Sequence, residues 1–214
     1  MINVLSLGMS KSGSTVLYNI IRLIWSHKFG DNEVYGCYYP EYKKEKFAKY
    51  NVVKCHNMIP LFKSEGRFIF DSVRDIRDIA ASHRLRGKSI EQIYKKLQRI
   101  AKRYNKVSKR TMYTMIYTNM MNDCKQEIVN VSKKLNIQLT NDDIDIIHKN
   151  LMSTDFHTSG GENNIKHNFK HNDLTLFHKN HIINGGNNYY KEVLDDEMIK
   201  NIESDYPALC INGI

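Results

Sequence analysis

A short loop of small residues near the N-terminus constrains the fold of this chain more than any other stretch. Residues 2–7 are largely apolar, residues 8–14 are rich in glycine and serine, and apolar side chains then recur at helical spacing from Val16 to Ile24. This pattern predicts a strand, a glycine-bearing loop and a helix. Such a loop aims backbone N–H groups and a helix N-terminus at one place, which suits a phosphate group. We therefore expect a phosphate-binding loop, with other ligands placed relative to it.

The loop is close to the Walker A pattern G-x-x-x-x-G-K-S/T but departs from it at one position. Gly8 and Gly13 have the right spacing, whereas Ser14 stands where the pattern has a lysine that reaches the outer phosphates of a nucleoside triphosphate. The lysine of this loop is Lys11, which we expect over the mouth of the loop, where its charge suits a bridging or leaving oxygen. An ordinary strand-to-helix turn is the alternative interpretation of the loop taken alone.

This loop resembles the 5′-phosphosulfate loop of sulfotransferases that use 3′-phosphoadenosine 5′-phosphosulfate (PAPS), which is of the P-K-S-G-T-T type. The matching stretch is Lys11-Ser12-Gly13-Ser14-Thr15. The resemblance implies cofactor contacts from Lys11, Ser12, Gly13, Ser14, Thr15 and Val16. It also implies a catalytic role for Lys11.

A second informative segment, Tyr50 to Pro60, is predicted to be a buried strand ended by the proline. Lys54 and His56 lie near its carboxyl end and share a face, because side chains alternate along a strand. Ligands of open parallel sheets bind at the carboxyl ends of strands. His56 there can act as general base on an acceptor hydroxyl while Lys54 holds developing negative charge. The spacing resembles the K-x-H-x-x-P segment that carries the catalytic base in cytosolic sulfotransferases, although K-x-H alone is a common pattern.

Residues 67–83 form a third segment, an apolar strand followed by a charged turn and a helix. They resemble the 3′-phosphate motif of the same family, V-R-D-P-R-D-V-A-x-S. The resemblance implies that Arg74 and Ser82 bind the 3′-phosphate, and the planar fork of arginine suits phosphate oxygens. Arg77 and Asp78 match positions that orient the turn, so they stay outside the predicted site.

The next segment is predicted to place a tyrosine near the nucleotide base. Residues 111–117 have the pattern of a strand, and residues 119–135 that of one amphipathic helix. This order resembles the R-Y-E-D-L strand and following helix of the family, which implies that Tyr117 lies near the adenine. Two positions depart from the family pattern. Asn119 stands where the family often has an acid, and Ile76, in the third segment, stands where the family usually has a proline.

The last third of the chain is less decisive. Residues 181–191 resemble the late H-I-x-x-G-x-x-x-x-Y-K segment of bacterial and viral-type members and precede a predicted helix over 195–204. The R-K-G triplet with which animal cytosolic enzymes hold the 3′-phosphate is missing, and the residues that could replace it are Lys166, Lys170, Arg84 and Arg86. His167 and His171 have the spacing of a helical metal pair, but without an acidic third ligand at a telling spacing we predict no metal site.

Composition limits the class of protein. The 214 residues, 41% of them hydrophobic, suit one domain with a sizeable core, so we expect a single sulfotransferase domain over residues 1–214. The four cysteines form neither a C-x-x-C pair nor a zinc pattern, as in a reduced cytosolic protein. No apolar run approaches the roughly 18 residues of a membrane span, and the N-terminus lacks a secretory leader pattern. These features predict an intact cytoplasmic protein without a membrane span.

The formal net charge of +9 predicts an anionic partner. Much of the excess lies in residues 95–110, where basic and apolar side chains alternate at helical spacing. Such a helix has a solvated basic face, which favours solubility and the attraction of acidic ligands. No dedicated nucleic-acid module is recognisable, so nucleic acid is not an expected partner.

Together the segments predict an α/β fold, a single-domain parallel sheet of about five strands flanked by helices, of the P-loop-NTPase-like sulfotransferase type. The resemblance implies metal-free transfer of a sulfuryl group from PAPS to a hydroxyl or amine, releasing 3′-phosphoadenosine 5′-phosphate (PAP), with His56, Lys11 and Lys54 catalytic. The acceptor, a small molecule or a glycan, stays open, as does the oligomeric state. Residues 33–39 are predicted to form a strand whose tyrosines either line the acceptor pocket or pack as an edge. A P-loop small-molecule kinase and a non-catalytic binder of polyanions or nucleic acid are the alternatives.

Overall fold

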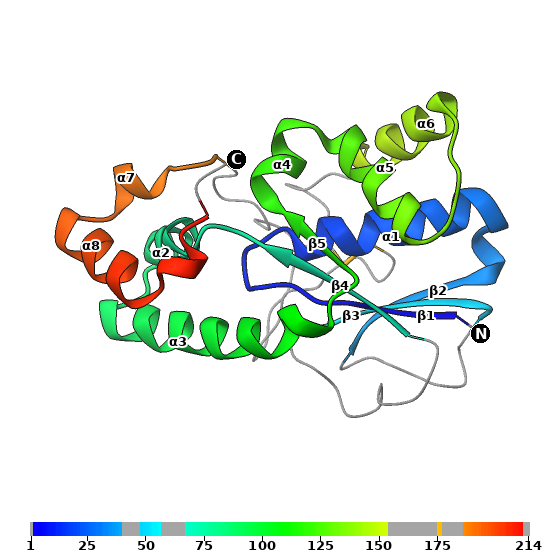
Figure 1. Cartoon of the computed structure of the whole chain (residues 1–214). Helices are drawn as coiled ribbons and strands as arrows, with labels where there is room; N and C mark the ends of the chain where they lie inside the picture. Colours follow the sequence, from blue (N-terminus) through cyan, green and yellow to red (C-terminus); the bar gives the residue numbers. More distant parts are fainter. Residues whose placement is uncertain (1, 40–47, 57–66, 154–174, 177–185, 212–214) are drawn as a thin grey trace, which may run out of the picture.

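The computed structural model describes residues 2–39, 48–56, 67–153, 175–176 and 186–211. In these residues, parallel strands form one five-stranded sheet in the order β2-β3-β1-β4-β5 (Figure 1). The strands are β1 (Ile2–Ser6), β2 (Val34–Tyr38), β3 (Tyr50–Lys54), β4 (Arg67–Val73) and β5 (Tyr113–Ile116). From β1 the chain builds one side of the sheet with β2 and β3, and then the other side with β4 and β5. The carboxyl end of β1 is therefore the switch point at which such sheets bind ligands.

Helices cover both faces of this sheet, which confirms the predicted fold class (Figure 1). Val4 and Val52 pack with α1, while Leu5 and Val53 pack with Val107 of α3 on the other face, because side chains alternate along a strand. The described helices are α1 (Ser14–Phe29), α2 (Ile76–Leu85), α3 (Ile90–Val107), α4 (Tyr117–Asn122), α5 (Cys124–Lys134), α6 (Asn141–Met152), α7 (Tyr190–Val193) and α8 (Asp196–Asp205).

Helices α2 and α3 start at side-chain caps. The Asp75 carboxylate accepts a hydrogen bond from the backbone N–H of Arg77 (2.8 Å) and starts α2 directly after β4. Ser89 and Gln92 form a capping box at the start of α3, and both devices satisfy N–H groups that the first turn leaves free. As a result α2 begins at the edge of the sheet where ligands are expected.

One helix prediction was wrong and one helix was missed. Residues 119–135 form two helices instead of one, because Asp123 has a non-helical φ of −148° and its carboxylate accepts from the N–H of Gln126 (2.9 Å) to start α5. Helix α6, which begins at a capping box of Thr140 and Asp143, was not predicted. The division of residues 119–135 comes from a local side-chain-to-backbone hydrogen bond, which hydrophobic periodicity does not detect. The signals for α6, namely Ile144, Ile147 and Leu151 at helical spacing after Thr140, were present in the sequence.

Some predicted features lie outside the described residues. They are residues 57–60 at the end of the second segment, including Pro60, then Lys166, Lys170, the His167 and His171 pair, and residues 181–185 of the late segment. Within the described ranges, no helix combines the length and the apolar character needed to cross a membrane.

Candidate active site

The loop predicted to bind phosphate joins β1 to α1, and its shape depends on two glycines. A Cβ on Gly8 would lie 2.2 Å from the Cβ of Ser14 and 2.3 Å from the Oγ of Ser72, far inside contact distance. Gly13 has a φ of 79°, in the left-handed region that glycine adopts without strain. Lys11 has a φ of 69°, which costs energy for a residue with a side chain. The loop therefore holds a tight, strained shape at the switch point of the sheet.

A buried hydroxyl cluster fixes this loop to β4. The Oγ of Ser12 lies 2.8 Å from the carbonyl oxygen of Met9, 2.9 Å from that of Ser72 and 2.7 Å from the Ser72 hydroxyl. Ser12 is fully buried. Its backbone N–H donates to the carbonyl oxygen of Met9 as well (3.3 Å), so both polar groups of Ser12 hold the loop in shape.

The N-terminus of α1 faces the loop without a side-chain cap. Gly13 occupies the N-cap position, and no described side chain accepts from the first N–H groups of the helix. The hydroxyl of Thr15 is buried with no hydrogen-bond partner in the described part of the chain, and Ser14 and Val16 are also buried. The first N–H groups of a helix carry partial positive charge and have no partner within the helix. This end of α1 therefore suits an anion.

Lys54 and His56 lie beside this loop, as predicted, at the end of β3. Lys54 pairs in register with Ser6, the last residue of β1, and its Nζ lies 5.3 Å from the ring centroid of Tyr38 on β2. The Nδ1 of His56 is 3.1 Å from the carbonyl oxygen of Gly8. Since a carbonyl oxygen can only accept, Nδ1 carries the hydrogen and the Nε2 of neutral His56 keeps a free lone pair. That is the form a general base needs.

Burial and mutual repulsion shift the pKa values of these three basic groups downward. Burial, followed by Arg86 and Lys54, lowers the pKa of Lys11 to about 8. Burial lowers the pKa of Lys54 to about 8, and burial, followed by Lys54, lowers the pKa of His56 to about 4. Lys11 also lowers the pKa of His56, so the structure brings together all three predicted catalytic residues. Such clustered shifts are typical of functional sites.

Arg74 follows β4 and is enclosed in this structure. Its Nη1 donates to the carbonyl oxygen of Lys11 (3.4 Å) and its Nη2 to that of Gly186 (2.7 Å). The guanidinium carbon lies 4.2 Å from the ring centroid of Tyr117 and 5.3 Å from that of Tyr189, within cation–π range. Arg74 thus joins the phosphate-binding loop, α4 and the segment before α7.

The Gly186–Tyr190 segment is fastened to α2 by a residue that the sequence analysis set aside. The carboxylate of Asp78 accepts from the N–H groups of Asn188 and Tyr190, each at 3.1 Å. The phenol of Tyr189 donates to the carbonyl oxygen of Asp78 (2.9 Å) and is hydrogen-bonded to the Ser82 side chain. Ser82 is therefore close to Arg74, as predicted, with the Tyr189 ring at the same place.

Tyr117 lies where the phosphate-binding loop meets α4. It is buried, and a Cβ on Gly13 would come within 2.9 Å of its ring. Tyr189 was missed by the sequence analysis, although it belongs to the late tyrosine-containing segment that resembles the family. That resemblance was the only sequence feature that could have pointed to Tyr189, because a single uncharged tyrosine forms no charge pattern or motif of its own.

Arg84 and Arg86, the two described residues that could replace the R-K-G triplet, lie in different environments. Arg86, just past the end of α2, lowers the pKa of Lys11 and so lies near it. Arg84 is exposed. His83 is buried, and its Nε2 has no hydrogen-bond partner among the described residues. Of the two arginines, Arg86 is the one that the structure brings to the site.

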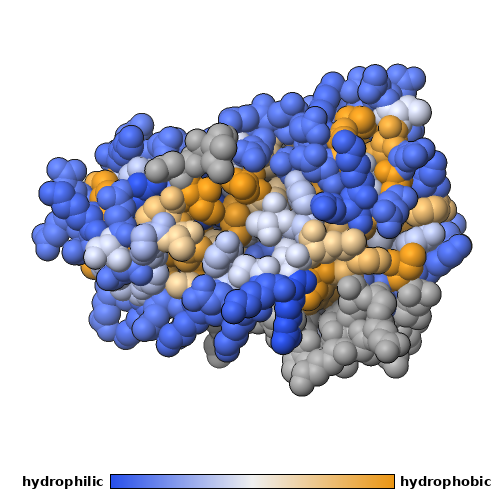
Figure 2. All heavy atoms as spheres, viewed as in Figure 1, coloured by the Kyte–Doolittle hydropathy of each residue, from blue (hydrophilic) through white to orange (hydrophobic). Residues whose placement is uncertain are grey.

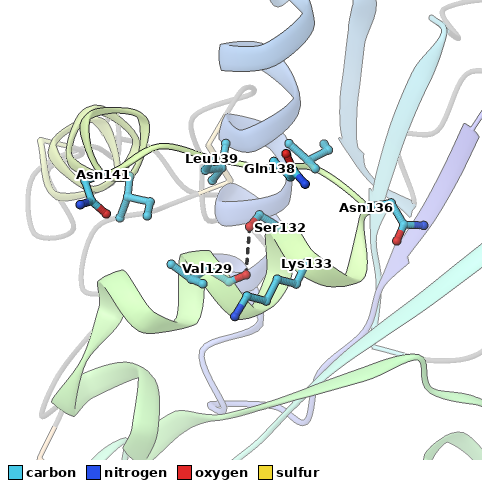
Figure 3. A pocket seen from close by; sticks show the side chains of 9 residues that line it. Val129, Ser132, Lys133, Asn136, Gln138, Leu139 and Asn141 are labelled. Atoms are coloured by element: carbon cyan, nitrogen blue, oxygen red, sulfur yellow. Dashed lines mark hydrogen bonds between the residues drawn. The ribbon is translucent and has the colours of Figure 1, made fainter.

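Two further observations concern possible metal ligands and a cavity away from these residues. The described chain contains no cluster of three or more histidine, cysteine or acidic side chains able to hold a metal. A cavity of about 700 Å³ lies between α5 and α6 (Figure 3). Its lining is formed by Val129, Ser132, Lys133, Asn136, Ile137, Gln138, Leu139, Asn141 and Ile144. None of the candidate site residues borders it.

Comparison with known proteins identifies similar folds only among solved structures. No family model matches the chain, and no curated protein matches it. A retinol dehydratase in complex with androsterone and the inactive cofactor PAP is 15% identical, with a TM-score of 0.64 over 96% of this chain and 80% of that chain. Mouse sulfotransferase SULT7A1 complexed with PAP is 16% identical, with a TM-score of 0.66 over 97% of this chain and 84% of that chain. At these identities the likeness establishes the fold.

Proposed function

We propose that the protein is a sulfotransferase that moves the sulfuryl group of PAPS to a hydroxyl or amine. The observation that carries this proposal is the convergence of the uncapped N-terminus of α1 with Lys11, Lys54 and neutral His56 at the carboxyl ends of β1 and β3. The similar solved structures support it, because they were obtained with PAP.

The residues present fit the donor. Three features suit a bound oxyanion. The loop has no room for a side chain at Gly8, the N-terminus of α1 has no side-chain cap, and the buried hydroxyl of Thr15 has no hydrogen-bond partner among the described residues. We assign the 5′-phosphosulfate to Lys11, Ser12, Gly13, Ser14, Thr15 and Val16. The 3′-phosphate is assigned to Arg74 and Ser82, and the adenine to Tyr117.

Each catalytic side chain has a separate task in this proposal. PAPS supplies an activated sulfuryl group when it is bound. Nε2 of His56 takes the proton of the acceptor hydroxyl, while the Nδ1–H stays on the Gly8 carbonyl and orients the ring. Lys11 and Lys54 stabilise the negative charge that develops on the oxygens around the sulfur, so the proposal needs no metal.

The domain organisation, the location and the acceptor are also part of what we propose. We infer a single domain and a cytoplasmic location, with a small-molecule or glycan acceptor that enters beside Tyr38 and His56. The rings of these two residues lie 6.3 Å apart. Retinol dehydratase, which has a similar fold, was crystallised with androsterone and with retinol, and this supports a small-molecule acceptor.

The direct test is group transfer. The protein is incubated with PAPS carrying radiolabelled sulfur and a panel of phenols, alcohols, amines and sugars, with EDTA present. We expect label on an acceptor and release of PAP in equal amount. Transfer of the terminal phosphate of ATP in the presence of magnesium, with no transfer from PAPS, would replace this proposal by the kinase.

Arg74→Ala should weaken PAP binding by about 10-fold to 100-fold, the range for lost hydrogen bonds to a charged group. AMP, which lacks the 3′-phosphate, should lose much less affinity, and calorimetry on both nucleotides measures the difference. Arg74 has five N–H donors and uses two of them on the carbonyl oxygens of Lys11 and Gly186, which leaves others for a phosphate. Equal losses for PAP and AMP would instead assign Arg74 the structural task of joining Lys11 and Gly186.

PAP binding should take up protons near pH 8. The pKa values of Lys11 and Lys54 are lowered to about 8, and a bound anion raises the pKa of a neighbouring ammonium. The complex then holds more protons than the free protein, so PAP affinity falls as pH rises through about 8. Calorimetry at pH 8 in buffers of different ionisation enthalpy counts these protons. Binding heats that do not depend on the buffer would mean that neither lysine faces the nucleotide.

A further inference from the structure

Lys54 is a buried lysine that has no counter-ion in the described part of the chain. It is 7% exposed, and none of the ion pairs among the described residues includes it. The lysines of α3 have the usual environment of this side chain, since all of them are exposed and Figure 2 shows hydrophilic side chains over that helix. An ammonium group that leaves water without a partner destabilises a fold. The buried charge of Lys54 therefore requires another kind of stabilising contact.

The contact that the structure provides is the ring of Tyr38. The Nζ of Lys54 lies over this ring, 5.3 Å from its centroid, within the range in which the face of an aromatic ring attracts a cation. This attraction is stronger where water is excluded, as it is around Lys54. A carboxylate in the same place would neutralise the ammonium, whereas a tyrosine ring stabilises it and adds no net charge. The ammonium therefore keeps its attraction for a bound anion.

The sheet and α1 hold Tyr38 in this place. Tyr38 and Lys54 are the last residues of β2 and β3 and pair in parallel register, so their side chains lie on the same face of the sheet. Tyr38 packs there against the core cluster that contains Leu17 of α1. The strand comes close to α1 at Gly36, where a Cβ would lie 2.2 Å from the hydroxyl oxygen of Tyr18. The ring of Tyr38 therefore has a fixed place beside α1.

The same ring lies against the second catalytic side chain at this end of the sheet. The rings of Tyr38 and His56 are 6.3 Å apart and their planes are inclined by 67°, an edge arrangement that is favourable for aromatic pairs. The His56 ring is also held by the hydrogen bond between its Nδ1 and the carbonyl oxygen of Gly8. Tyr38 thus lies beside both residues that the proposed reaction uses at the end of β3.

We propose that Tyr38 is a positioning residue of the reaction, whose ring face holds the Lys54 ammonium as an unpaired cation beside the phosphate-binding loop. This inference rests on the proposed function and adds to it a residue that acts through Lys54. It gives Tyr38 a task other than lining the acceptor pocket or packing as an edge. Without the ring, a larger fraction of Lys54 is neutral near pH 8, and the transferring group loses part of the positive charge around it.

The first test measures the Lys54 ammonium without any reaction. Protein labelled with ¹³C in its lysines is titrated by NMR, and the Cε resonance of Lys54 is assigned by its loss from Lys54→Met. In wild type, burial lowers the pKa of Lys54 to about 8. Tyr38→Leu has no aromatic face and should lower this pKa further, to about 7. Tyr38→Phe keeps the face and should leave the pKa near that of wild type.

A ring with the same shape but a weaker negative face separates the attraction from the exclusion of water. The Tyr38→Phe protein is prepared with 3,4,5-trifluorophenylalanine at this position, a change that leaves the packing almost intact. The fluorines withdraw electron density from the ring face, so the pKa of Lys54 should be lower than with phenylalanine. Equal pKa values for the two rings would overturn the inference, because the ring would then serve only to exclude water.

Tyr35→Leu is the matched control. Tyr35 is on the same strand but on the opposite face of the sheet, where it packs against the core cluster that contains Val53. Its replacement should leave the pKa of Lys54 as it is in wild type. A Lys54 pKa that Tyr38→Leu leaves unchanged, or raises toward the ordinary value of 10.5, would also overturn the inference.

The second test asks whether Tyr38 acts through Lys54. Tyr38→Leu should lower kcat/KM for PAPS about fivefold at pH 8, because the charged fraction of Lys54 falls from about one half to about one tenth. The KM of the acceptor should stay near that of wild type, and the substitution should cost nothing more in a Lys54→Met background. Equal losses in both backgrounds, or a raised acceptor KM alone, would overturn the inference. Absence of any transfer from PAPS by wild type would count against the proposed function, while the NMR titration would still test the contact between Tyr38 and Lys54.

Discussion

Substitution of His56 by alanine is expected to lower the sulfuryl-transfer rate by about 10²–10⁴-fold, the usual contribution of a general base, while PAP affinity stays near that of wild type. The reason lies in the geometry at the end of β3. Nδ1–H donates to the Gly8 carbonyl (3.1 Å), which leaves Nε2 as the base. Burial and Lys54 keep the imidazole neutral by lowering its pKa to about 4. A bound anion raises that pKa, so the base is stronger in the complex than in the free protein.

Two further variants separate base chemistry from positioning. His56→Asn can keep a donor near the Gly8 carbonyl but has no basic nitrogen, and it should be as inactive as the alanine variant. His27→Ala removes an exposed histidine in the last turn of α1, about 20 Å along the helix from Ser14, and should turn over normally. Wild-type rates in His56→Asn would reduce His56 to a support for the loop.

Lys54→Met is expected to lower the rate by about 10²–10³-fold, as for loss of one charge-stabilising donor, and to raise the melting temperature. Lys54 is 7% exposed, and its pKa is lowered from 10.5 to about 8 by burial. The folded state therefore disfavours the charged ammonium, and the folded protein carries this cost below about pH 8. The cost fades as pH rises toward 10.5. The stability gain of the methionine variant should accordingly be largest at neutral pH and small near pH 10.5.

Lys49→Met is the matched control for this substitution. Lys49 precedes β3, is exposed, and its Nζ lies 5.7 Å from the ring centroid of Tyr50, much as Lys54 lies over Tyr38. Its replacement should leave the rate unchanged. An active Lys54→Met enzyme, or one that is less stable at pH 7, would remove Lys54 from the proposed catalytic group.

The phosphate-binding loop and the end of β3 could be predicted because the functional residues of each are close together in the sequence. Small residues between an apolar run and a helical pattern predicted the turn from β1 into α1, and the two-residue period placed Lys54 and His56 at one strand end. Their meeting with Lys11 follows from the parallel pairing of β1 with β3. The parallel sheet itself could be predicted from the alternation of apolar strands with helical segments.

What could not be predicted depends on contacts between segments distant in sequence. The enclosure of Arg74 by Gly186 and Tyr189 links residues more than a hundred positions apart. Asp78, set aside as a turn residue, holds the segment before α7 through two N–H groups.

The central claim is that the site binds a 3′-phosphorylated adenine nucleotide, and thermal unfolding with PAP tests it most directly. A ligand at about 100 times its dissociation constant adds about 2.7 kcal/mol to the free energy of unfolding, enough for a clear rise in melting temperature. We predict a large shift with PAP that EDTA does not change, and a much smaller shift with ADP. A shift with ATP and magnesium, but none with PAP, would contradict the account.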